Sequence, residues 1–347
     1  MKAKDLAKEI GVSEATVSLV INGKPGISQK TREMVESKII EMGYGSMLRQ
    51  EAPSPSSQGK VISFVLYKEN GKLLGSNTFF PLILDGIEST ARKNGYTLNI
   101  INIEHESIDR DILFIKESNC AGYVIFATEM HEDVLDRFVG LGMPFVVFDN
   151  EFLGRNLNSV KVNNEQGTYL AVRHLRDMGH RRIGYLSSGL YINSFIERQK
   201  YALSAIERLN LEGGRETVYT IGYPNTHAEE GMDALLEVVS AKDLPTAFLA
   251  DNDLVAMGAM KSLTKHGYRI PEDFSFVGYD DRPVCMYIEP NLTTIRLPRE
   301  TFGATAVAVL IQQIENNMPA KVTVEVNGTL IARDSVRYMN DDNNEEA

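Results

Sequence analysis

The sequence predicts a chain of two unlike parts, a small all-α head of three helices followed by a larger α/β body. Three amphipathic helical patterns lie within residues 1–48, and residues 49–60 are rich in proline and serine, as linkers are. From residue 61 onward, short apolar runs alternate with amphipathic helical patterns. We therefore expect a head at 1–48, a linker at 49–60 and a body at 61–340.

The first two helical patterns of the head have the spacing of a helix-turn-helix. Their inner faces carry Leu6, Ala7 and Ile10, then Val17, Val20 and Ile21. Between them, Gly11 can adopt the left-handed conformation that ends a helix, and Ser13 can cap the next one. A third pattern begins where Ser28 is the expected cap. A generic helical subdomain is the alternative, but in a helix-turn-helix the second helix enters the DNA major groove.

The body alternates between strand-like and helix-like segments, which predicts doubly wound parallel sheets with right-handed crossovers. Some runs, such as Phe145–Phe148, are apolar throughout, as strands covered on both faces require. The expected strands are Val61–Tyr67, Thr97–Asn102, Gly122–Thr128, Pro144–Asp149, Ser159–Val162, Arg182–Ser187, Thr217–Gly222, Thr246–Ala250, Phe274–Gly278 and Leu292–Leu297. The expected helices are Phe80–Asn94, Asp133–Leu141, Asn164–Met178, Ile196–Leu209, His227–Val239, Asp253–His266 and Glu300–Asn316. Ten strands exceed one comfortable sheet, so we expect two similar Rossmann-like lobes.

Composition excludes several classes of protein. With 43% hydrophobic and 24% charged residues among 347, the chain has the makeup of an ordinary globular protein. No stretch approaches the roughly 20 apolar residues of a membrane span, and the polar start Met1–Ile10 does not read as a secretory signal. Cys120 and Cys285 stand far apart, which favours a reducing cytoplasm over a disulfide framework.

The negative charge of the chain is unevenly distributed. The net charge is −11, yet residues 1–50 carry eight basic and six acidic side chains, a surplus of +2 that leaves −13 for the remainder. A mildly basic head on an acidic body is compatible with a nucleic-acid partner for the head alone.

The body lacks the motifs of common enzymes. It contains no glycine-rich nucleotide loop, no His-Glu-x-x-His, no Gly-x-Ser-x-Gly and no Cys-x-x-Cys. The six histidines are scattered, and both cysteines sit in apolar surroundings. We therefore expect no catalytic residues, no metal and no cofactor.

Polar side chains instead follow several of the expected strands, where parallel sheets bind ligands. Each could simply cap a helix or form a turn, so the prediction depends on their convergence. Carboxylate, amide, guanidinium and aromatic groups together suit a polyhydroxylated ligand. The candidate effector-binding residues are Asn77, Phe79, Asp149, Asn150, Arg198, Asn252 and Asp280.

The head carries a series of short motifs, namely Lys4-Asp5-Leu6-Ala7, Gly11-Val12-Ser13, Thr16-Val17-Ser18, Asn22-Gly23-Lys24-Pro25, Ser28, Thr31-Arg32 and Met42-Gly43-Tyr44. These motifs give the head a resemblance to the LacI/GalR family of bacterial repressors. It implies that Thr16 and Ser18 hold phosphates, and that Glu14, Ala15 and Leu19 face the bases. The full set of DNA-binding residues that it implies is Lys4, Ser13, Glu14, Ala15, Thr16, Ser18, Leu19, Asn22, Ser28, Thr31, Arg32 and Tyr44.

Two departures from the family pattern concern DNA recognition. Leu19 stands where the family usually has arginine, so it can offer apolar contact but no bidentate bond to guanine. The family's Pro-Asn-x-x-Ala-Arg-x-Leu hinge, which wedges a leucine into the minor groove, is missing from residues 45–53. Leu48 and Arg49 are the only candidates to replace it, and whether this segment forms a hinge helix is left open.

The body continues the resemblance through Gly179-His180-Arg181-Arg182-Ile183 and the run from Pro271 to Asp281. It implies a periplasmic-binding-protein-like clamshell, with lobe 1 at about 61–160 plus 292–323 and lobe 2 at about 161–291 plus 324–340. The family's effector, commonly a sugar or a nucleobase, lies between the lobes. Arg198, Asn252 and Asp280 match its contact positions, with Phe79 and Asp149 next. Asn150 replaces a frequent arginine and Leu297 a frequent glutamine, so a simple sugar is not assured.

The leading hypothesis is a homodimeric, cytoplasmic transcription repressor of carbohydrate-utilisation genes that binds operator DNA and a sugar-like effector. Its dimer face would include Phe80–Asn94, as the family resemblance implies. The alternative is a solute-binding protein of a transport system, which shares the clamshell but has an export signal and no DNA-binding head. An enzyme on a doubly wound fold is a third hypothesis. The sequence does not reveal whether the effector releases the head from DNA or recruits it.

Overall fold

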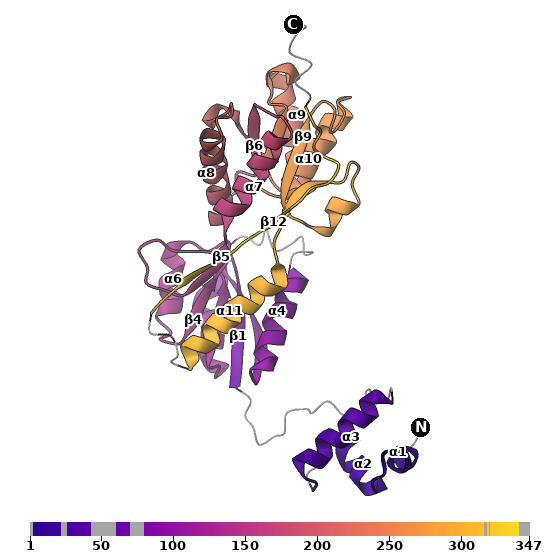
Figure 1. The fold of residues 1–347 in the computed structure, drawn as a ribbon. Coiled ribbons are helices and arrows are strands. Elements are labelled where there is room, and N and C mark those ends of the chain that lie inside the picture. The colour runs from indigo at the N-terminus through magenta and orange to yellow at the C-terminus, as the bar shows by residue number, and fades with distance from the viewer. Residues whose placement is uncertain are drawn as a thin grey trace. The chain divides into compact units, whose positions relative to one another are not determined.

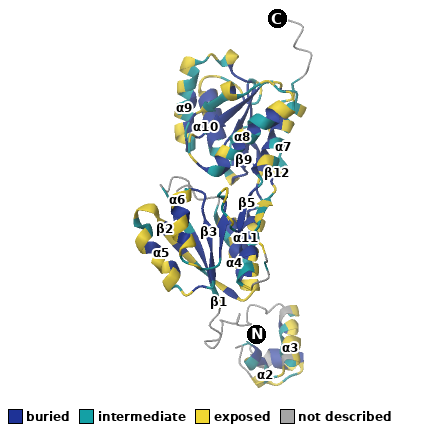
Figure 2. Cartoon of the chain, turned by 90° about the vertical axis from the view of Figure 1, so that its left-hand side faces the viewer, coloured by how far each residue is buried: buried dark blue, intermediate teal, exposed yellow. Residues whose placement is uncertain are grey.

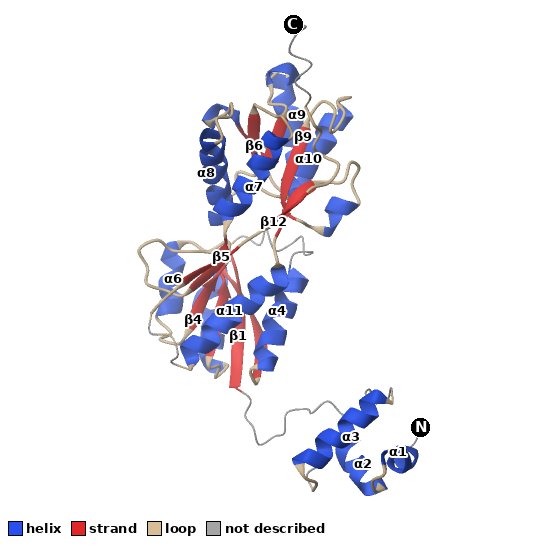
Figure 3. Cartoon of the chain, viewed as in Figure 1, coloured by secondary structure: helices blue, strands red, loops and turns tan. Residues whose placement is uncertain are grey.

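The computed structural model describes residues 3–21, 26–42, 60–69, 80–315, 318 and 320–339. The chain divides into two compact units, a head within Met1–Gly59 and a body within Lys60–Ala347. Figure 1 traces both units in chain order, and Figure 3 marks their helices and strands.

The described part of the head consists of three helices, α1 (Ala3–Ile10), α2 (Glu14–Ile21) and α3 (Gln29–Glu41), which share one apolar core. Leu6, Val17 and Ile39, one from each helix, are fully buried in it. Gly11 has a φ of +81°, and its N–H donates to the carbonyl of Ala7 at 3.0 Å. The predicted helix end at this glycine is therefore confirmed.

Lobe 1 of the body is built on a six-stranded, all-parallel sheet with the order β11-β5-β4-β3-β1-β2. Its strands are β1 (Lys60–Lys68), β2 (Tyr96–Glu104), β3 (Gly122–Phe126), β4 (Phe145–Phe148), β5 (Ser159–Val162) and β11 (Thr323–Val326). The apolar clusters place helices α4 (Phe80–Lys93) and α11 (Arg299–Ile314) on one face, and α5 (Ile108–Glu117) and α6 (Glu132–Val139) on the other.

Lobe 2 repeats this plan with the order β12-β10-β9-β8-β6-β7. Its strands are β6 (Ile183–Ser187), β7 (Val218–Thr220), β8 (Ala247–Ala250), β9 (Ser275–Asp280), β10 (Thr293–Arg296) and β12 (Thr329–Ile331). Only the added edge strand differs, because β12 is antiparallel to β10 whereas β11 is parallel to β5. Helices α7 (Asn164–Asp177) and α8 (Asn193–Arg208) cover one face, and α9 (Asn225–Val238) and α10 (Asp253–Lys265) the other.

The chain passes between the lobes three times: after β5, after β10, and between β11 and β12. Two expected lobe boundaries differ from this. We assigned 292–323 to lobe 1, but β10 extends the lobe 2 sheet beside β9, so the crossing comes after it. We assigned 324–340 to lobe 2, but β11 pairs with β5 in lobe 1 as far as Val326.

Among the α-helices and strands of the described residues, three escaped the sequence prediction: β11, β12 and α5. The two strands are only four and three residues long and none of their residues is buried, so they lack the apolar runs of core strands. In α5, Leu113 and Phe114 are each 50% exposed, which blurs the apolar periodicity of this helix.

The cores of both lobes are the apolar strands that the sequence predicts. Every residue of β3, β4, β8 and β9 is buried, and Figure 2 shows buried strands between exposed outer helix faces. Strands of this kind are covered by helices on both sides, as parallel sheets require. None of the helices in the described ranges combines the length and the apolar character that a membrane span needs.

Candidate DNA-reading helix and ligand site

Helix α2 turns one face to the head core and another outward. Val17 and Val20 are buried. The predicted contact residues of this helix are exposed or partly exposed, namely Glu14, Ala15, Thr16, Ser18 and Leu19. This is the arrangement that a recognition helix needs, because its outer face must be open to the major groove.

The N-termini of α2 and α3 are capped in the same way. Ser13 Oγ accepts a hydrogen bond from the Thr16 N–H at 3.1 Å, and Ser28 Oγ accepts one from the Thr31 N–H at 3.2 Å. Both predicted caps are confirmed. A helix N-terminus attracts anions, so both ends suit the phosphate contacts expected of them. Arg32, beside Thr31, is partly exposed.

Part of the predicted DNA interface lies outside the described residues. This holds for Asn22, for Tyr44, for the side chain of Lys4 and for the segment 45–53 where a hinge is in question. In the body, the predicted effector residues Asn77 and Phe79 lie outside the described residues as well.

The five remaining effector candidates of the body lie at the end of a strand or on the loops and helices that follow strands. Asp149 and Asn150 follow β4 in lobe 1. In lobe 2, Asp280 ends β9, Asn252 follows β8, and Arg198 lies on the helix that follows β6. The carboxyl ends of these strands are the edge of each sheet at which ligands bind in doubly wound folds.

Arg198 is buried, with only 4% of its surface exposed, and contacts from three parts of lobe 2 hold its side chain in place. Its guanidinium donates to Oδ1 of Asn164 at 3.0 Å and to the carbonyl of Asp251 at 2.6 Å. It also lies 3.4 Å from Oδ1 of Asp280 and 3.7 Å from the centre of the Tyr279 ring. A buried cation fixed in this way is pre-organised to bind a ligand oxygen.

Asp149 is a buried aspartate of lobe 1 whose pKa depends on charged side chains of lobe 2. Its Oδ2 accepts a hydrogen bond from Thr128 Oγ1 at 2.5 Å. Burial raises the pKa of Asp149 to about 6, while Thr128 and Arg198 oppose this rise and Asp280 adds to it. Because Arg198 and Asp280 belong to lobe 2, the groups of the two lobes lie within electrostatic reach of each other.

Two predicted effector residues, Asn252 and Asn150, form hydrogen bonds to the backbone that stabilise the fold. Oδ1 of Asn252 caps α10 by accepting from the N–H groups of Leu254 and Val255, both at 3.1 Å, which leaves its amide nitrogen for a ligand. The amide nitrogen of Asn150 donates to the carbonyls of Ala127 and Met130. Its oxygen accepts from the N–H of Glu151. Asn150 therefore fastens two loops together, and its role as an effector contact stays a prediction.

Sequence reasoning assigned no supporting role to the residues that position Arg198 and Asp149. Asn164 begins the helix after the first lobe crossing, Asp251 follows β8, and Thr128 follows β3. Asp251 also accepts from the hydroxyl of Tyr185 at 2.5 Å and from the N–H of Ser188 at 2.6 Å. Their positions directly after strands were the available signal, but only the fold shows which groups they support.

An ion-pair network joins the lobes beside this site. Lys161 on β5 is 7% exposed, and its Nζ lies 2.7 Å from Glu151 Oε2 in lobe 1 and 2.8 Å from Glu197 Oε1 in lobe 2. Glu197 also accepts a hydrogen bond from Asn164. The network therefore fastens helix α8, and with it Arg198, to the lobe 1 side.

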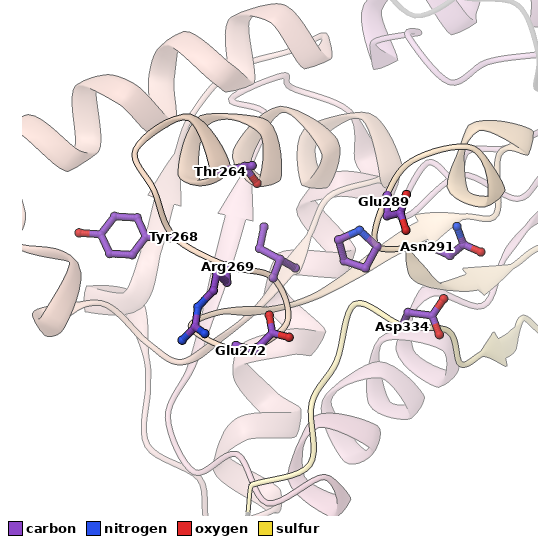
Figure 4. A pocket seen from close by; sticks show the side chains of 9 residues that line it. Thr264, Tyr268, Arg269, Glu272, Glu289, Asn291 and Asp334 are labelled. Atoms are coloured by element: carbon purple, nitrogen blue, oxygen red, sulfur yellow. The ribbon is translucent and has the colours of Figure 1, made fainter.

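Two cavities of the body differ in their relation to the sheets. One of about 270 Å³ is lined by residues of both lobes, among them Thr128, Asn150 and Tyr191. A larger hollow of about 590 Å³, shown in Figure 4, is lined by Thr264, Arg269, Glu272, Glu289 and Asp334. Its loops precede β9 and β10, at the amino ends of the strands. The loops around the smaller cavity follow β3, β4 and β6, so this cavity lies at the carboxyl ends of the strands, the edge at which doubly wound folds bind ligands.

The chain matches two known families. Residues 2–46 match the bacterial regulatory proteins of the lacI family, and residues 172–336 match the periplasmic binding protein-like domain. The HTH-type transcriptional repressor PurR of Yersinia enterocolitica is 31% identical over 340 residues, covering 96% of each chain. The PurR repressor of Vibrio vulnificus is 30% identical over 344 residues, covering 97% of this chain and 99% of its own.

Solved structures show the same architecture. The transcriptional regulator CelR in complex with cellobiose has a TM-score of 0.71 and 25% identity, covering 96% of this chain and 99% of its own. The lac repressor dimer bound to operator and the anti-inducer ONPF has a TM-score of 0.70 and 25% identity, covering 97% and 99%. The head and the clamshell body thus define a ligand-sensing class of DNA-binding transcription regulator. Within that class, the chain belongs to the LacI family and is a DNA-binding transcriptional repressor. Its relatives are repressors rather than enzymes, and the solute-binding alternative is not favoured.

Proposed function

We propose that this repressor controls carbohydrate-utilisation genes and is itself controlled by a sugar-like effector bound between its two lobes. The observation that carries the proposal is the meeting of Arg198 and Asp280 from lobe 2 with Asp149 from lobe 1. A ligand that bonds to both sides favours one lobe arrangement over others. It can shift that equilibrium only by its difference in affinity for the arrangements.

The chemistry of these groups suits neighbouring hydroxyls. A carboxylate accepts hydrogen bonds and a guanidinium donates them, so together they pair with the two roles of each hydroxyl. Nucleobases are the competing class, and they need open flat faces for stacking. In the described part of the site, the Tyr279 ring is covered by Arg198 at 3.7 Å, and the same guanidinium lies 5.5 Å from the Phe195 ring centre. At this point of the site, hydrogen bonds to hydroxyl groups are therefore favoured over stacking on a ring.

A thermal-shift screen of sugars and purine bases tests the effector class. A ligand raises the apparent stability of the chain by mass action, and we expect at least one neutral sugar to do so. Arg198→Ala should abolish the shift. Arg208→Ala changes an exposed arginine at the other end of α8 and should keep it. A shift produced by purine bases alone would overturn the carbohydrate proposal.

We also propose a homodimer that reads a pseudo-palindromic operator in the bacterial cytoplasm. Each copy supplies one head for one half-site, because two-fold protein symmetry matches two-fold DNA symmetry. Lobe 1 exposes a large apolar side chain on each of three elements, Leu82 on α4, Ile100 on the edge strand β2 and Phe114 on α5, at 40%, 46% and 50%. Their exposure, together with the family resemblance for α4, supports pairing through this lobe.

A further inference from the structure

The carboxylate of Asp281 lies in a buried ion cluster beside the effector candidates. Asp281 directly follows Asp280, and its side chain is 8% exposed. Its Oδ1 accepts a hydrogen bond from Nη2 of Arg333, and its Oδ2 accepts one from Nε of Arg296, both at 2.6 Å. Charge-assisted hydrogen bonds of this length are among the strong contacts of a protein. We call these three side chains the Asp281 clasp.

The backbone of Asp281 is held as firmly as its side chain. Its carbonyl accepts a hydrogen bond from Nη2 of Arg299 at 2.6 Å. Arg299 is buried and is the first residue of α11, so this contact reaches from lobe 2 into lobe 1. The φ values of Asp280 and Asp281 are +104° and +49°. Two consecutive residues keep such a conformation only where the surrounding structure fixes it, and the clasp and Arg299 do so here.

The Asp281 clasp lies beside two of the three passages between the lobes. Arg296 ends β10 and Arg299 begins α11. Only Leu297 and Pro298 stand between them, and Leu297 is buried in the apolar core. Arg333 stands two positions after β12, the strand that follows the last passage. Because these segments are short and packed, a movement of Asp281 displaces them as well.

Helix α11 extends this connection to α4. A Cβ atom on Gly86 of α4 would overlap the carbonyl of Glu300. A Cβ atom on Gly303 of α11 would overlap the carbonyl of Ile83. The two helices therefore pack backbone against backbone and move together. Since α4 belongs to the face that we propose for dimerisation, Asp281 is connected to that face through α11.

We propose that Asp281 is a positioning residue for the response to the effector, which couples Asp280 to lobe 1 through the Asp281 clasp and Arg299. The inference rests on the proposed effector site. A ligand that displaces the carboxylate of Asp280 also shifts the backbone of its neighbour, and the two arginines of the clasp transmit this shift to the passages. Without the charge of Asp281, the effector still binds, but the arrangement of the lobes changes less.

A titration of the full chain against duplex DNA from upstream of its own gene tests this coupling. The Kd is measured without a probe and with saturating glucose, galactose, ribose or adenine. One of these probes should change the Kd of the unsubstituted chain about fivefold or more, as coupled ligands do. Asp281→Asn keeps the size of the side chain but removes its charge, so the change should fall to about twofold or less. The same probe should still raise the melting temperature of the variant.

Two substitutions at Arg296 separate the charge from general effects on folding. Its side chain is 52% exposed, so both variants should fold even if Asp281→Asn does not. Arg296→Lys keeps a cation and should keep the change in Kd, whereas Arg296→Gln should reduce it. Asp273→Asn breaks a pair with Arg269 elsewhere in lobe 2 and should have no effect on the change. An Asp281→Asn or Arg296→Gln chain that keeps the full change overturns the proposal, even if it melts earlier.

A distance measurement decides the question even if none of the probes changes the Kd. Spin labels at the exposed positions of Lys116→Cys on α5 and Glu207→Cys on α8 report the separation of the lobes, and Cys120 and Cys285 are buried. In labelled chain diluted with unlabelled chain, Asp281→Asn should broaden the distribution of distances and Asp273→Asn should not. An unchanged distribution overturns the proposal. A broadened distribution without any response to the probes supports the clasp and counts against the proposed effector control.

Discussion

Asp149 and Asp280 show at the residue scale how the site is held ready for a ligand. Their φ values are +62° and +104°, a region that non-glycine residues seldom occupy. Both carboxylates are also buried, which costs free energy unless partners compensate. Strained backbone conformations and buried charges of this kind cluster at ligand-binding and active sites, where they cost folding free energy.

The first prediction concerns Asp149→Asn. In the folded chain the carboxyl keeps its proton up to a pKa of about 6, whereas an ordinary aspartate loses it at about 3.8. Unfolding therefore releases a proton between these values, and stability falls as the pH rises through this window. Asparagine does not ionise, so the variant does not lose this stability as the pH rises. The variant should be more stable at pH 7.5 by up to about 3 kcal/mol and should show a flatter profile between pH 4 and 7.

Urea unfolding of the full chain across this pH range measures the effect. Asp177→Asn, at an exposed carboxylate of α7, is the matched control and should leave the profile unchanged. An Asp149→Asn profile that keeps the slope of the unsubstituted chain would show that this carboxyl is ionised throughout the window.

The sequence identifies site residues by type and position, but not their partners. It places Asp149, Arg198 and Asp280 after strands, where the structure has them. It could not show that the amide nitrogen of Asn150 donates to backbone carbonyls 23 and 20 residues earlier in the chain, or that Asn252 caps a helix with its oxygen. Those facts depend on how loops from different strands meet.

At the scale of elements, α8 is fastened to lobe 1 through Lys161. This lysine is the one charged residue of β5, and sequence analysis assigned it no role. Three carboxylates surround it, with Glu325 of β11 at 3.6 Å in addition to Glu151 and Glu197. Burial alone would lower the pKa of Lys161, but the hydrogen bonds and charges of Glu151 and Glu197 outweigh it and raise the pKa, so the lysine is charged at neutral pH.

The second prediction is that Lys161→Met destabilises the body by about 3 kcal/mol, because it leaves Glu151 and Glu197 without their cation. Combining it with Glu151→Gln and Glu197→Gln should restore most of the loss. Lys265→Met breaks an exposed pair with Asp233 and should change stability by less than about 1 kcal/mol. Unfolding in urea measures all three. If the single and triple variants are equally unstable, the ion pairs do not explain the loss.

The third prediction concerns the cap of α3. Ser28→Ala removes the acceptor for the Thr31 N–H and should destabilise this helix by about 1 kcal/mol. Hydrogen exchange of backbone amides in residues 31–39 should then accelerate about fivefold. Ser28→Asn keeps an oxygen that can cap and should restore slow exchange. Faster exchange in both variants would indicate that the hydroxyl serves another purpose.

At the scale of the whole molecule, the periodicity of apolar residues and the turn- and cap-forming residues between segments are enough to predict a three-helix head and two parallel-sheet lobes. The boundary between the lobes was misplaced because β10 joins the lobe 2 sheet, between β9 and β12, although the helix after it belongs to lobe 1. The pattern of apolar residues along the chain cannot show which sheet a short strand joins. Hydrogen-bonded pairing with strands distant in the sequence determines this.

The fourth prediction tests the proposed dimer by light scattering. Phe114→Asp places a charge on the exposed apolar surface of α5 and should shift the chain from two copies toward one. Val238→Asp places the same charge on α9 of lobe 2 and should leave two copies. A monomeric unsubstituted chain would contradict the proposed dimer, and a Phe114→Asp variant that stays dimeric would contradict pairing through α5.

The most direct measurement is a titration of the full chain against duplex DNA from upstream of its own gene, repeated across a salt series. The account predicts saturable binding that is much tighter than to a scrambled duplex and weakens steeply with salt, as phosphate contacts require. It also predicts that the neutral sugar found to stabilise the chain changes the Kd for the upstream duplex. Equal affinity for both duplexes, or a Kd that this sugar leaves unchanged, would contradict a repressor in which ligand binding to the body controls DNA binding by the head.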